Sequence, residues 1–410
     1  MKSVEDVYSQ GLCCGCGACK IVCNLDAISI KESNNGFLHS KVDKRRCIGC
    51  GKCLKVCPGE KLYLRKNLSD VVGSVRKAYI GYATDETTRL NGQSGGIITA
   101  IIASLLETNT VKKAWVNIFD ENVNRNRFSC ITKAEELIKS EGSYYAQTNL
   151  PDAELSNSVI TVLGCQAEAL RCIKSEGYII GLFCAGNHSR KYYDCLEHIA
   201  YGEYEEKVKE FRFRDKKNGG WPGNVQIKTD IRNYEIPAQI RMRQKTYYKC
   251  FRCDLCSDIF NLNGDISVGD PWGLELDEAE RKAGMSVILV RSDKGQEMID
   301  IAVREHKIVI QEIDVNKIVN GQGIDDRYLK NKINAIRLFE KRKTDLALCE
   351  ICELKYHKMV STGETDIYKA KAKYGRIVKK IMIIRRIKHC VDNIKRKTGR
   401  KEELDENLNV

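Results

Sequence analysis

Residues 13–23 read CCGCGACKIVC and residues 47–57 read CIGCGKCLKVC, and this repeated cysteine spacing decides the fold of the N-terminal part of the chain. Each stretch contains Cys-x2-Cys-x2-Cys-x3-Cys with glycines on both sides of its second cysteine, and the copies lie 34 residues apart. Residues 1–66 hold nine cysteines but few long apolar stretches, so this part cannot build a large hydrophobic core. We therefore predict a tandem unit over residues 1–66 that bound metal holds together.

The spacing is typical of bacterial dicluster ferredoxins, in which three neighbouring thiolates bind one 4Fe-4S cluster and the fourth reaches the other cluster. It predicts a first cluster held by Cys13, Cys16, Cys19 and Cys57, and a second held by Cys47, Cys50, Cys53 and Cys23. Zinc sites usually use two separated ligand pairs and disulfides do not suit a reducing compartment, so both alternatives are weaker. Asn24 stands where ferredoxins have proline, and Cys14 is an additional thiol that a shifted register would recruit.

The composition of the 410 residues, 42% hydrophobic and 30% charged, indicates a folded protein of two to three domains. The first ten residues contain Glu5 and Asp6 and no apolar signal-peptide region, and residues 381–384 form the longest apolar run of the basic C-terminal part. We therefore expect a cytoplasmic protein. The net charge is +13, of which residues 366–410 carry +8, so a general nucleic-acid-binding surface is not predicted.

Residues 77–340 are expected to form an α/β domain, because apolar β-type runs alternate there with helical patterns. We divide it into an N-terminal part, about 77–155, and a C-terminal part, about 156–340. Strands are predicted at 78–82, 114–118, 159–163, 178–183, 286–290 and 308–311, and helices at 97–107, 166–175, 191–198 and 296–305.

Two turns in this domain precede predicted helices. The first contains Ser94, Gly95 and Gly96, and the second contains Gly164 and Gln166. Free backbone amides at a helix N-terminus favour an anion, such as a phosphate or pyrophosphate group. An ordinary turn is the simpler interpretation of both, and spacing alone does not decide between the two.

A third set of cysteines points to a cluster in the α/β domain. Cys250, Cys253 and Cys256 have the Cys-x2-Cys-x2-Cys spacing but no fourth cysteine after three residues, so the fourth ligand must come from elsewhere. Cys165 and Cys184 both follow predicted strands, where α/β folds place ligands, and we favour Cys165. Zinc or unliganded thiols are the alternatives. Asp265 and Asp270, further on, either orient a polar ligand or cap a turn.

Five motifs occur in this order along the chain: QSGGIITA, EGSYYAQT, VLGCQAEAL, GLFCAG and CFRCDLCSDIFNLNGDISVGDPWG. With these motifs, the chain resembles the beta-subunit family of deazaflavin-reducing (coenzyme F420) hydrogenases and dehydrogenases. The resemblance covers about 1–340, and bacterial relatives with the same ferredoxin fusion accompany genes of surface-polysaccharide synthesis or pyruvyl transfer. It implies noncovalent FAD near Ser94, Gly95, Gly96 and the turn from Gly164 to Gln166, and a core iron–sulfur cluster. The chain departs from the family pattern by Val162-Leu163-Gly164 instead of Gly-Thr-Pro before Cys165, and by Ala185 instead of histidine after Cys184.

The expected fold is therefore α+β followed by α/β: a small ferredoxin-like dicluster domain, a mixed α/β flavin-binding domain and a C-terminal basic amphipathic helix. The resemblance implies an iron–sulfur flavoprotein oxidoreductase that exchanges electrons with ferredoxin or another redox protein and with an unknown two-electron partner. A role in polysaccharide synthesis and use of the deazaflavin coenzyme are expectations of the same kind. The alternatives are a non-catalytic electron-transfer subunit that docks a partner enzyme, and a binding or sensor protein with structural clusters.

Residues 366–401 are predicted to form the amphipathic helix, with isoleucine and valine every three to four residues and lysine and arginine on its flanks. It either packs against protein or attaches reversibly to the inner face of the cytoplasmic membrane, where each cation near an anionic leaflet gains about 1 kcal/mol. We assign no role to the pair Cys349 and Cys352, since no second ligand pair follows, nor to His188, for which the sequence shows no partner carboxylate.

Overall fold

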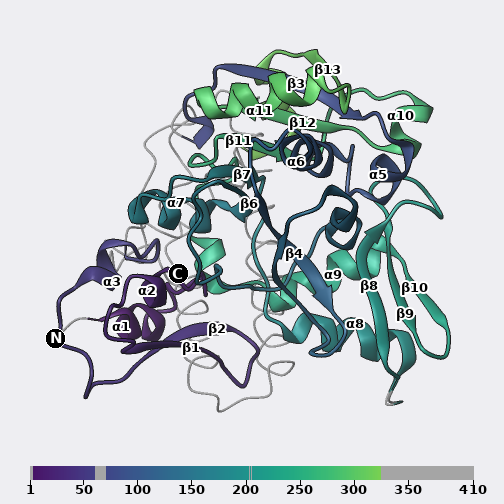
Figure 1. Cartoon of the computed structure of the whole chain (residues 1–410). Coiled ribbons are helices and arrows are strands. Elements are labelled where there is room, and N and C mark those ends of the chain that lie inside the picture. Colours follow the sequence, from purple (N-terminus) through teal and green to yellow (C-terminus); the bar gives the residue numbers. More distant parts are fainter. Residues whose placement is uncertain (1–2, 61–70, 203, 205, 325–410) are drawn as a thin grey trace, which may run out of the picture. The chain divides into compact units, whose positions relative to one another are not determined.

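The computed structural model describes residues 3–60, 71–202, 204 and 206–324, and Figure 1 shows their arrangement. The predicted helix over 366–401 and the pair Cys349 and Cys352 lie outside these residues. Within the described ranges, no helix is both long enough and apolar enough to cross a membrane.

The N-terminal unit is built from two similar cysteine loops and a hairpin. Its elements are α1 (Val4–Ser9), α2 (Ala18–Ile21), β1 (Ile28–Glu32), β2 (Leu38–Val42) and α3 (Lys52–Lys55). The glycines beside the second cysteine of each motif all have positive φ: Gly15, Gly17, Gly49 and Gly51. A side chain at Gly17 would in addition lie 2.8 Å from Cβ of Asn149. Only glycine therefore allows this loop to fold and to approach the rest of the chain closely.

The large sheet has eight strands in the order β13-β3-β12-β11-β7-β6-β4-β5. Its centre, β11-β7-β6-β4, is parallel, and the flanking pairs are antiparallel. The strands are β3 (Lys77–Ala83), β4 (Lys113–Asp120), β5 (Arg125–Ile131), β6 (Ser158–Leu163), β7 (Tyr178–Leu182), β11 (Ile266–Gly269), β12 (Ser286–Val290) and β13 (Ile308–Glu312). The continuously apolar sequence of the central strands follows from burial on both faces.

The two faces of this sheet carry different helices. Val159 of β6 and Ile180 of β7 pack with α6 (Ile97–Glu107) and α11 (Asp293–Arg304), which contact each other (Figure 1). The adjacent residues Ile160 and Ile179 point to the opposite face and pack with α7 (Gly164–Ile173). Cys14, Cys16 and Ala18 belong to that second cluster, so the N-terminal unit covers the same face as α7. Further helical elements are α5 (Glu86–Asn91), η1 (Ala134–Ser140), α10 (Glu278–Ala283) and α12 (Val315–Gly321).

A second, antiparallel sheet consists of β8 (Val208–Asp215), β9 (Asn224–Thr229) and β10 (Asn233–Ile236). It packs with α8 (Lys191–Tyr201) and α9 (Ala238–Tyr248) around buried aromatic rings, and η2 (Phe251–Asp254) follows. Tyr193, Phe211 and Phe213 form the centre of this aromatic cluster, with ring centroids 4.6–5.0 Å apart.

The six strands and four helices predicted for the α/β domain are confirmed within one to three residues at their ends. The sequence analysis did not predict β5, the second sheet or α9. The sequence of α9, AQIRMRQKTYY, has no apolar stripe with helical period, so its helical state depends on tertiary contacts.

Buried hydrogen bonds join the N-terminal unit to the sheet domain. Gln147 is fully buried, accepts from the backbone N–H of Leu38 (2.8 Å) and donates to the carbonyl of Cys14 (3.1 Å). The backbone N–H of Leu150 donates to the carbonyl of Cys16 (2.8 Å). Because unpaired polar groups are costly inside a protein, these bonds hold the first cysteine loop in one position on the sheet domain.

Replacement of Gln147 with leucine should lower the free energy of unfolding by about 2–4 kcal/mol, since each buried group left unpaired costs about 1–3 kcal/mol. Chemical denaturation followed by circular dichroism measures this change. Gln311→Leu, at an exposed position of β13, is the matched control and should change stability by less than about 0.5 kcal/mol. Equal effects of both substitutions would contradict the proposed role of Gln147.

Candidate functional site

The thiols of residues 250–256 lie against the segment that follows β7. The backbone N–H of Cys250 donates to the carbonyl of Asn187 (2.8 Å), and the N–H of Asn187 donates to the sulfur of Cys253 (3.3 Å). The neighbouring Cys250 thiol and the charge of Lys249 lower the pKa of Cys253 to about 7 despite burial. A thiol with a lowered pKa and a backbone amide directed at its sulfur suits metal ligation.

Cys165, in the first turn of α7, belongs to the same region of the fold. The thiols of Cys165 and Cys16 both donate to the sulfur of Cys14, which lowers the pKa of Cys14 and raises the pKa of both donors. The charge of Cys253 also raises the pKa of Cys165. Cys184, the other candidate for a fourth ligand, lies on the wall of a cavity. The structure therefore brings Cys165 together with thiols of both domains.

Arg252 is buried, with 4% of its surface exposed, at the junction of the two domains. Its guanidinium donates to the carbonyl of Pro58 (3.2 Å), while its Nε has no hydrogen-bond partner among the described residues. Burial by itself lowers the pKa of Arg252, but neighbouring sulfurs raise it above its ordinary value. These sulfurs belong to Cys256, Cys14, Cys165 and Cys253. Arg252 thus places a permanent positive charge among the thiols.

The thiols predicted to hold the first cluster gather next to this junction. The Cys250 thiol donates to the carbonyl of Cys13 (3.7 Å), which connects the two cysteine motifs directly. Burial raises the pKa of Cys13 to about 12 and that of Cys57 to about 11. Cys16 and Cys19 are also buried, and burial contributes to the raised pKa of each.

The thiols predicted to hold the second cluster lie further from the sheet domain. Cys23, Cys47 and Cys53 pack, together with Cys19 and Cys57, around Val4, Ile28 and Val42, whereas Cys50 is exposed. Among the described residues, no three cysteine, histidine or acidic side chains form a group that could hold a metal ion. The ligand assignments therefore rest on the cysteine spacing and on the thiol contacts given above.

A cavity of about 490 Å³ opens at the carboxyl ends of the parallel strands. Leu163 at the end of β6, Cys184 after β7 and Asp270 after β11 line it, together with residues of α6, α9 and β8. This is the edge where open α/β sheets bind ligands, and the volume lies within the usual range of small-molecule sites.

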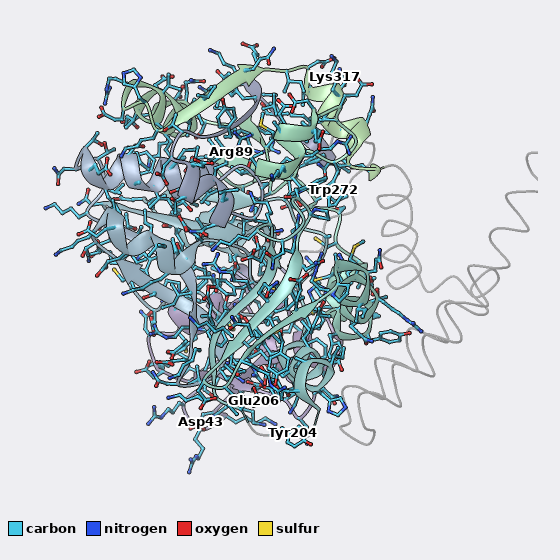
Figure 2. The ribbon with its side chains drawn as sticks, turned by 90° about the vertical axis from the view of Figure 1, so that its right-hand side faces the viewer. Asp43, Arg89, Tyr204, Glu206, Trp272 and Lys317 are labelled. Carbon is cyan, nitrogen blue, oxygen red and sulfur yellow. The ribbon has the colours of Figure 1, made fainter. Side chains whose placement is uncertain are left out.

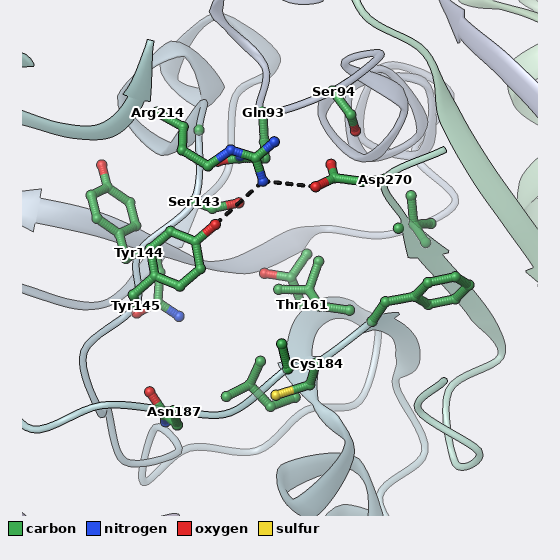
Figure 3. A pocket seen from close by; sticks show the side chains of 18 of the residues that line it. Gln93, Ser94, Ser143, Tyr144, Tyr145, Thr161, Cys184, Asn187, Arg214 and Asp270 are labelled. Atoms are coloured by element: carbon green, nitrogen blue, oxygen red, sulfur yellow. Dashed lines mark hydrogen bonds and ion pairs between the residues drawn. The ribbon is translucent and has the colours of Figure 1, made fainter. Parts of the chain in front are cut away.

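Arg214 of β8 organises the polar side of the cavity (Figure 3). Its guanidinium contacts the carboxylate of Asp270 (2.7 Å), the hydroxyl of Tyr145 (3.3 Å) and the carbonyl of Pro222 (2.6 Å). Asp270 and the hydroxyl of Tyr145 together raise the pKa of Arg214, although burial opposes this shift. Gln93 and Ser94 lie beside the guanidinium in the same view.

Additional cations surround this cavity. Arg241, Lys245 and Lys249 line it, and burial next to cationic neighbours lowers the pKa of Lys245. Behind the wall, Lys216 donates to the carbonyls of Arg89 (2.6 Å), Ser94 and Ala283 (2.7 Å), and so holds the turn that contains Ser94. The cavity wall carries four basic side chains and two carboxylates, Asp270 paired with Arg214 and Asp254 paired with Lys249 (2.8 Å), and this excess of basic groups favours a ligand that carries negative charge, such as a phosphate group.

Of the predicted cofactor-binding residues, Ser94, Gly96 and Gln166 line the cavity. Gly95 and Gly164 do not line it: the N–H of Gly95 donates to the hydroxyl of Ser286 (2.8 Å), and Gly164 packs against Asp258. Asp265 is buried and accepts from Arg171, Ser292 and the N–H of Ile179, so it supports the sheet, whereas Asp270 faces the cavity.

Sequence reasoning missed the residues that define the polar wall: Arg214, Arg241 and Lys245 belong to none of the quoted motifs, and Tyr145 was not singled out within EGSYYAQT. His188, to which we assigned no role, is buried on the same wall with its Nδ1 3.0 Å from the carbonyl of Tyr145.

Asn187 connects the thiols to the cavity. Its backbone contacts Cys250 and Cys253, as described above, and the residue itself lines the cavity near Cys184 (Figure 3). The cysteines of residues 250–256 therefore lie between the thiols of the N-terminal unit on one side and the cavity on the other.

Three family models match the chain. Residues 78–153 match the N-terminal model, and residues 155–316 the C-terminal model, of the family described as coenzyme F420 hydrogenase/dehydrogenase, beta subunit. Residues 12–60 match a 4Fe-4S dicluster domain.

Similar proteins occur in Methanocaldococcus jannaschii and Methanosarcina barkeri. The coenzyme F420-dependent sulfite reductase of Methanocaldococcus jannaschii is 24% identical over 342 residues, which are 76% of this chain and 49% of that protein. The chain thus spans about half the length of this relative. An uncharacterized protein of the same organism is 23% identical over 349 residues, 75% of this chain and 91% of its own length. A chain of the F420-reducing NiFe hydrogenase complex from Methanosarcina barkeri has a TM-score of 0.49 at 19% identity, covering 66% of this chain and 94% of that chain.

The ion pair of Arg214 and Asp270 is buried, with 5% and 14% of the respective side chains exposed. Arg214→Leu should lower the free energy of unfolding by about 3–5 kcal/mol, because it leaves a buried carboxylate without its partner. The double variant with Asp270→Leu should recover part of this loss, which denaturant titration can measure. Arg76→Leu, which removes an exposed pair with Asp293, is the control and should cost about 1 kcal/mol or less. A double variant as unstable as Arg214→Leu would contradict this explanation.

Proposed function

The chain belongs to the coenzyme F420 hydrogenase/dehydrogenase beta-subunit family and contains a 4Fe-4S dicluster domain, and on this premise we propose that it is an iron–sulfur flavoprotein oxidoreductase. In this proposal, electrons pass between the two N-terminal clusters, a third cluster at residues 250–256 and FAD in the cavity. The observation that carries it is the position of residues 250–256, which touch the N-terminal thiols through Cys13 and the cavity wall through Asn187.

The residues at the domain junction fit a third 4Fe-4S cluster. Cys250, Cys253 and Cys256 would hold it, with Cys165 as the fourth ligand, because Cys165 is the candidate that lies among the junction thiols. The unpaired Nε–H of the buried Arg252 and the N–H of Asn187 are donors of the kind that stabilise cluster sulfur. The permanent charge of Arg252 would also offset the negative charge that four thiolates bring to the site.

The cavity fits FAD by position and by charge. Arg241 and Lys245 would hold the negative charge of its pyrophosphate, and Ser94, Gly96 and Gln166 would line the bound molecule. A flavin supplies the conversion between one-electron and two-electron transfer, which clusters alone do not perform. Lys216 keeps the turn of Ser94 in place through three carbonyl contacts, so that the site is formed before a ligand binds.

We further propose a deazaflavin of the F420 type as the two-electron partner. The family name and the name of one relative, a coenzyme F420-dependent enzyme, support this choice. The alternative is a subunit that only passes electrons to a partner enzyme. The polysaccharide role and the membrane attachment of residues 366–401 stay predictions from the sequence alone.

Protein purified without oxygen should contain about twelve iron atoms and about one flavin per chain, since three 4Fe-4S clusters are expected. Iron and sulfide analysis, together with the absorbance of flavin released on denaturation, measures both numbers. About eight iron atoms would contradict the third cluster. Full iron content without flavin would support the electron-transfer subunit instead of the flavoprotein.

Cys165→Ser should lose about four iron atoms, whereas Cys184→Ser should retain the full iron content, because Cys165 lies among the thiols of the junction and Cys184 on the cavity wall. Iron analysis and electron paramagnetic resonance of the reduced variants compare the two cysteines directly. Iron loss from Cys184→Ser alone would show that the fourth ligand is Cys184.

A further inference from the structure

The two thiol sets of the N-terminal unit have different surroundings. The first set lies partly against the sheet domain, where Cys16 is buried and the carbonyl of Cys13 accepts from the Cys250 thiol. The second set reaches the surface: Cys50 is exposed, and Ile48, between Cys47 and Cys50, is 72% exposed. Leu25, two residues after Cys23, is 45% exposed. Two apolar side chains therefore project into solvent next to the ligands proposed for the second cluster.

Cations accompany these apolar side chains. Residues 41–55 contain six exposed basic side chains and one acidic residue, Asp43. The basic residues are Lys41, Lys44, Arg45, Arg46, Lys52 and Lys55. We call these cations, together with Leu25 and Ile48, the basic surface.

The acidic groups close to the basic surface do not neutralise it. Asp43 lies 3.6 Å from Arg45 and 4.0 Å from Arg46, and Glu5 lies 3.0 Å from Lys41. Asp26 is also exposed. Figure 2 shows Asp43 at the margin of the described residues. Within residues 41–55, six cations and one carboxylate leave a local charge of +5.

We propose that the basic surface docks an acidic one-electron carrier protein of the ferredoxin class, so that electrons cross the chain boundary at the second cluster. This inference rests on the proposed function, because it requires that Cys47, Cys50, Cys53 and Cys23 hold a cluster. In the transfer, the reduced carrier is oxidised by one electron and this chain is reduced by one electron, and no bond is formed or broken.

The composition of the surface matches this type of partner. Protein interfaces combine apolar and polar groups, and here the exposed Leu25 and Ile48 provide apolar area close in the sequence to exposed cations. Opposite charges accelerate encounter between proteins, and salt weakens this attraction. The first cluster is less accessible, because Cys16 and Cys19 are buried and Cys13 and Cys57 are half-buried, whereas Cys50 of the second set is exposed.

The test uses the anaerobic full-length protein, reduced in a stopped-flow instrument by a bacterial ferredoxin of strongly negative net charge. We expect Lys44→Glu/Arg45→Glu/Arg46→Glu to slow this reduction by about tenfold or more at low ionic strength. The rate of the unchanged protein should fall steeply with salt, and that of the variant should not. Transfer to cytochrome c, a basic acceptor, should become faster in the variant.

Two variants serve as comparisons. Lys52→Glu/Lys55→Glu changes the same surface from α3 and should also slow the reaction. Lys112→Glu/Lys113→Glu/Lys133→Glu reverses three exposed cations of the sheet domain and should stay within about twofold of the unchanged protein. Dithionite, a small reductant, should reduce all of them at the same rate.

The outcomes separate the docking inference from the proposed function. Suppose that the unchanged protein contains iron and is reduced by dithionite. If neither salt nor charge reversal then alters the rate of its reduction by ferredoxin, the docking inference is wrong and the proposed function stands. If the unchanged protein contains no iron or sulfide, the proposed function itself is wrong.

Discussion

The contact between the N-terminal unit and the sheet domain is the constraint on which the rest of the structure depends. It is made by buried polar groups: Gln147 binds backbone groups of Leu38 and Cys14, and Arg252 donates to the carbonyl of Pro58. Such groups favour arrangements in which their hydrogen-bond partners are present, because an unpaired buried polar group is costly. The interface therefore specifies one position of the first cysteine motif relative to residues 250–256.

Buried basic side chains lie at the domain junction and at the cavity, and each has a defined compensation. Arg214 is paired with Asp270, Lys216 donates to three carbonyls, and Arg252 is surrounded by sulfur. A buried charge without such compensation would cost several kcal/mol. Asp265 is a buried carboxylate whose charge is compensated in the same way, by Arg171, the hydroxyl of Ser292 and the N–H of Ile179. This residue supports the sheet and does not face the cavity.

These contacts arrange the proposed cofactor sites in one order, from the second cysteine set, which reaches the surface at Cys50, through the first set to residues 250–256 and then to the cavity. Asn187 lies at the last of these steps, where its backbone contacts Cys253 and its residue borders the cavity. The carboxyl ends of parallel strands supply the cavity wall, which is the general place for ligands in open α/β sheets. The arrangement explains why one chain of this family combines a dicluster domain with a sheet domain.

The parts of the structure that could be predicted from the sequence are those marked by a local pattern of residues. Cysteine spacing predicts the N-terminal repeat, whose glycines have positive φ, and hydrophobic period predicts the strands and helices of the sheet domain. The order of the motifs identified the family. Tertiary packing alone places Cys165 among the junction thiols and Cys184 on the cavity wall. It also brings Arg214 and Lys245 to the cavity that Ser94 lines. These residues are far apart in the chain and carry no periodic signal, so only the packing of β8, α9 and the N-terminal unit against the sheet brings them together.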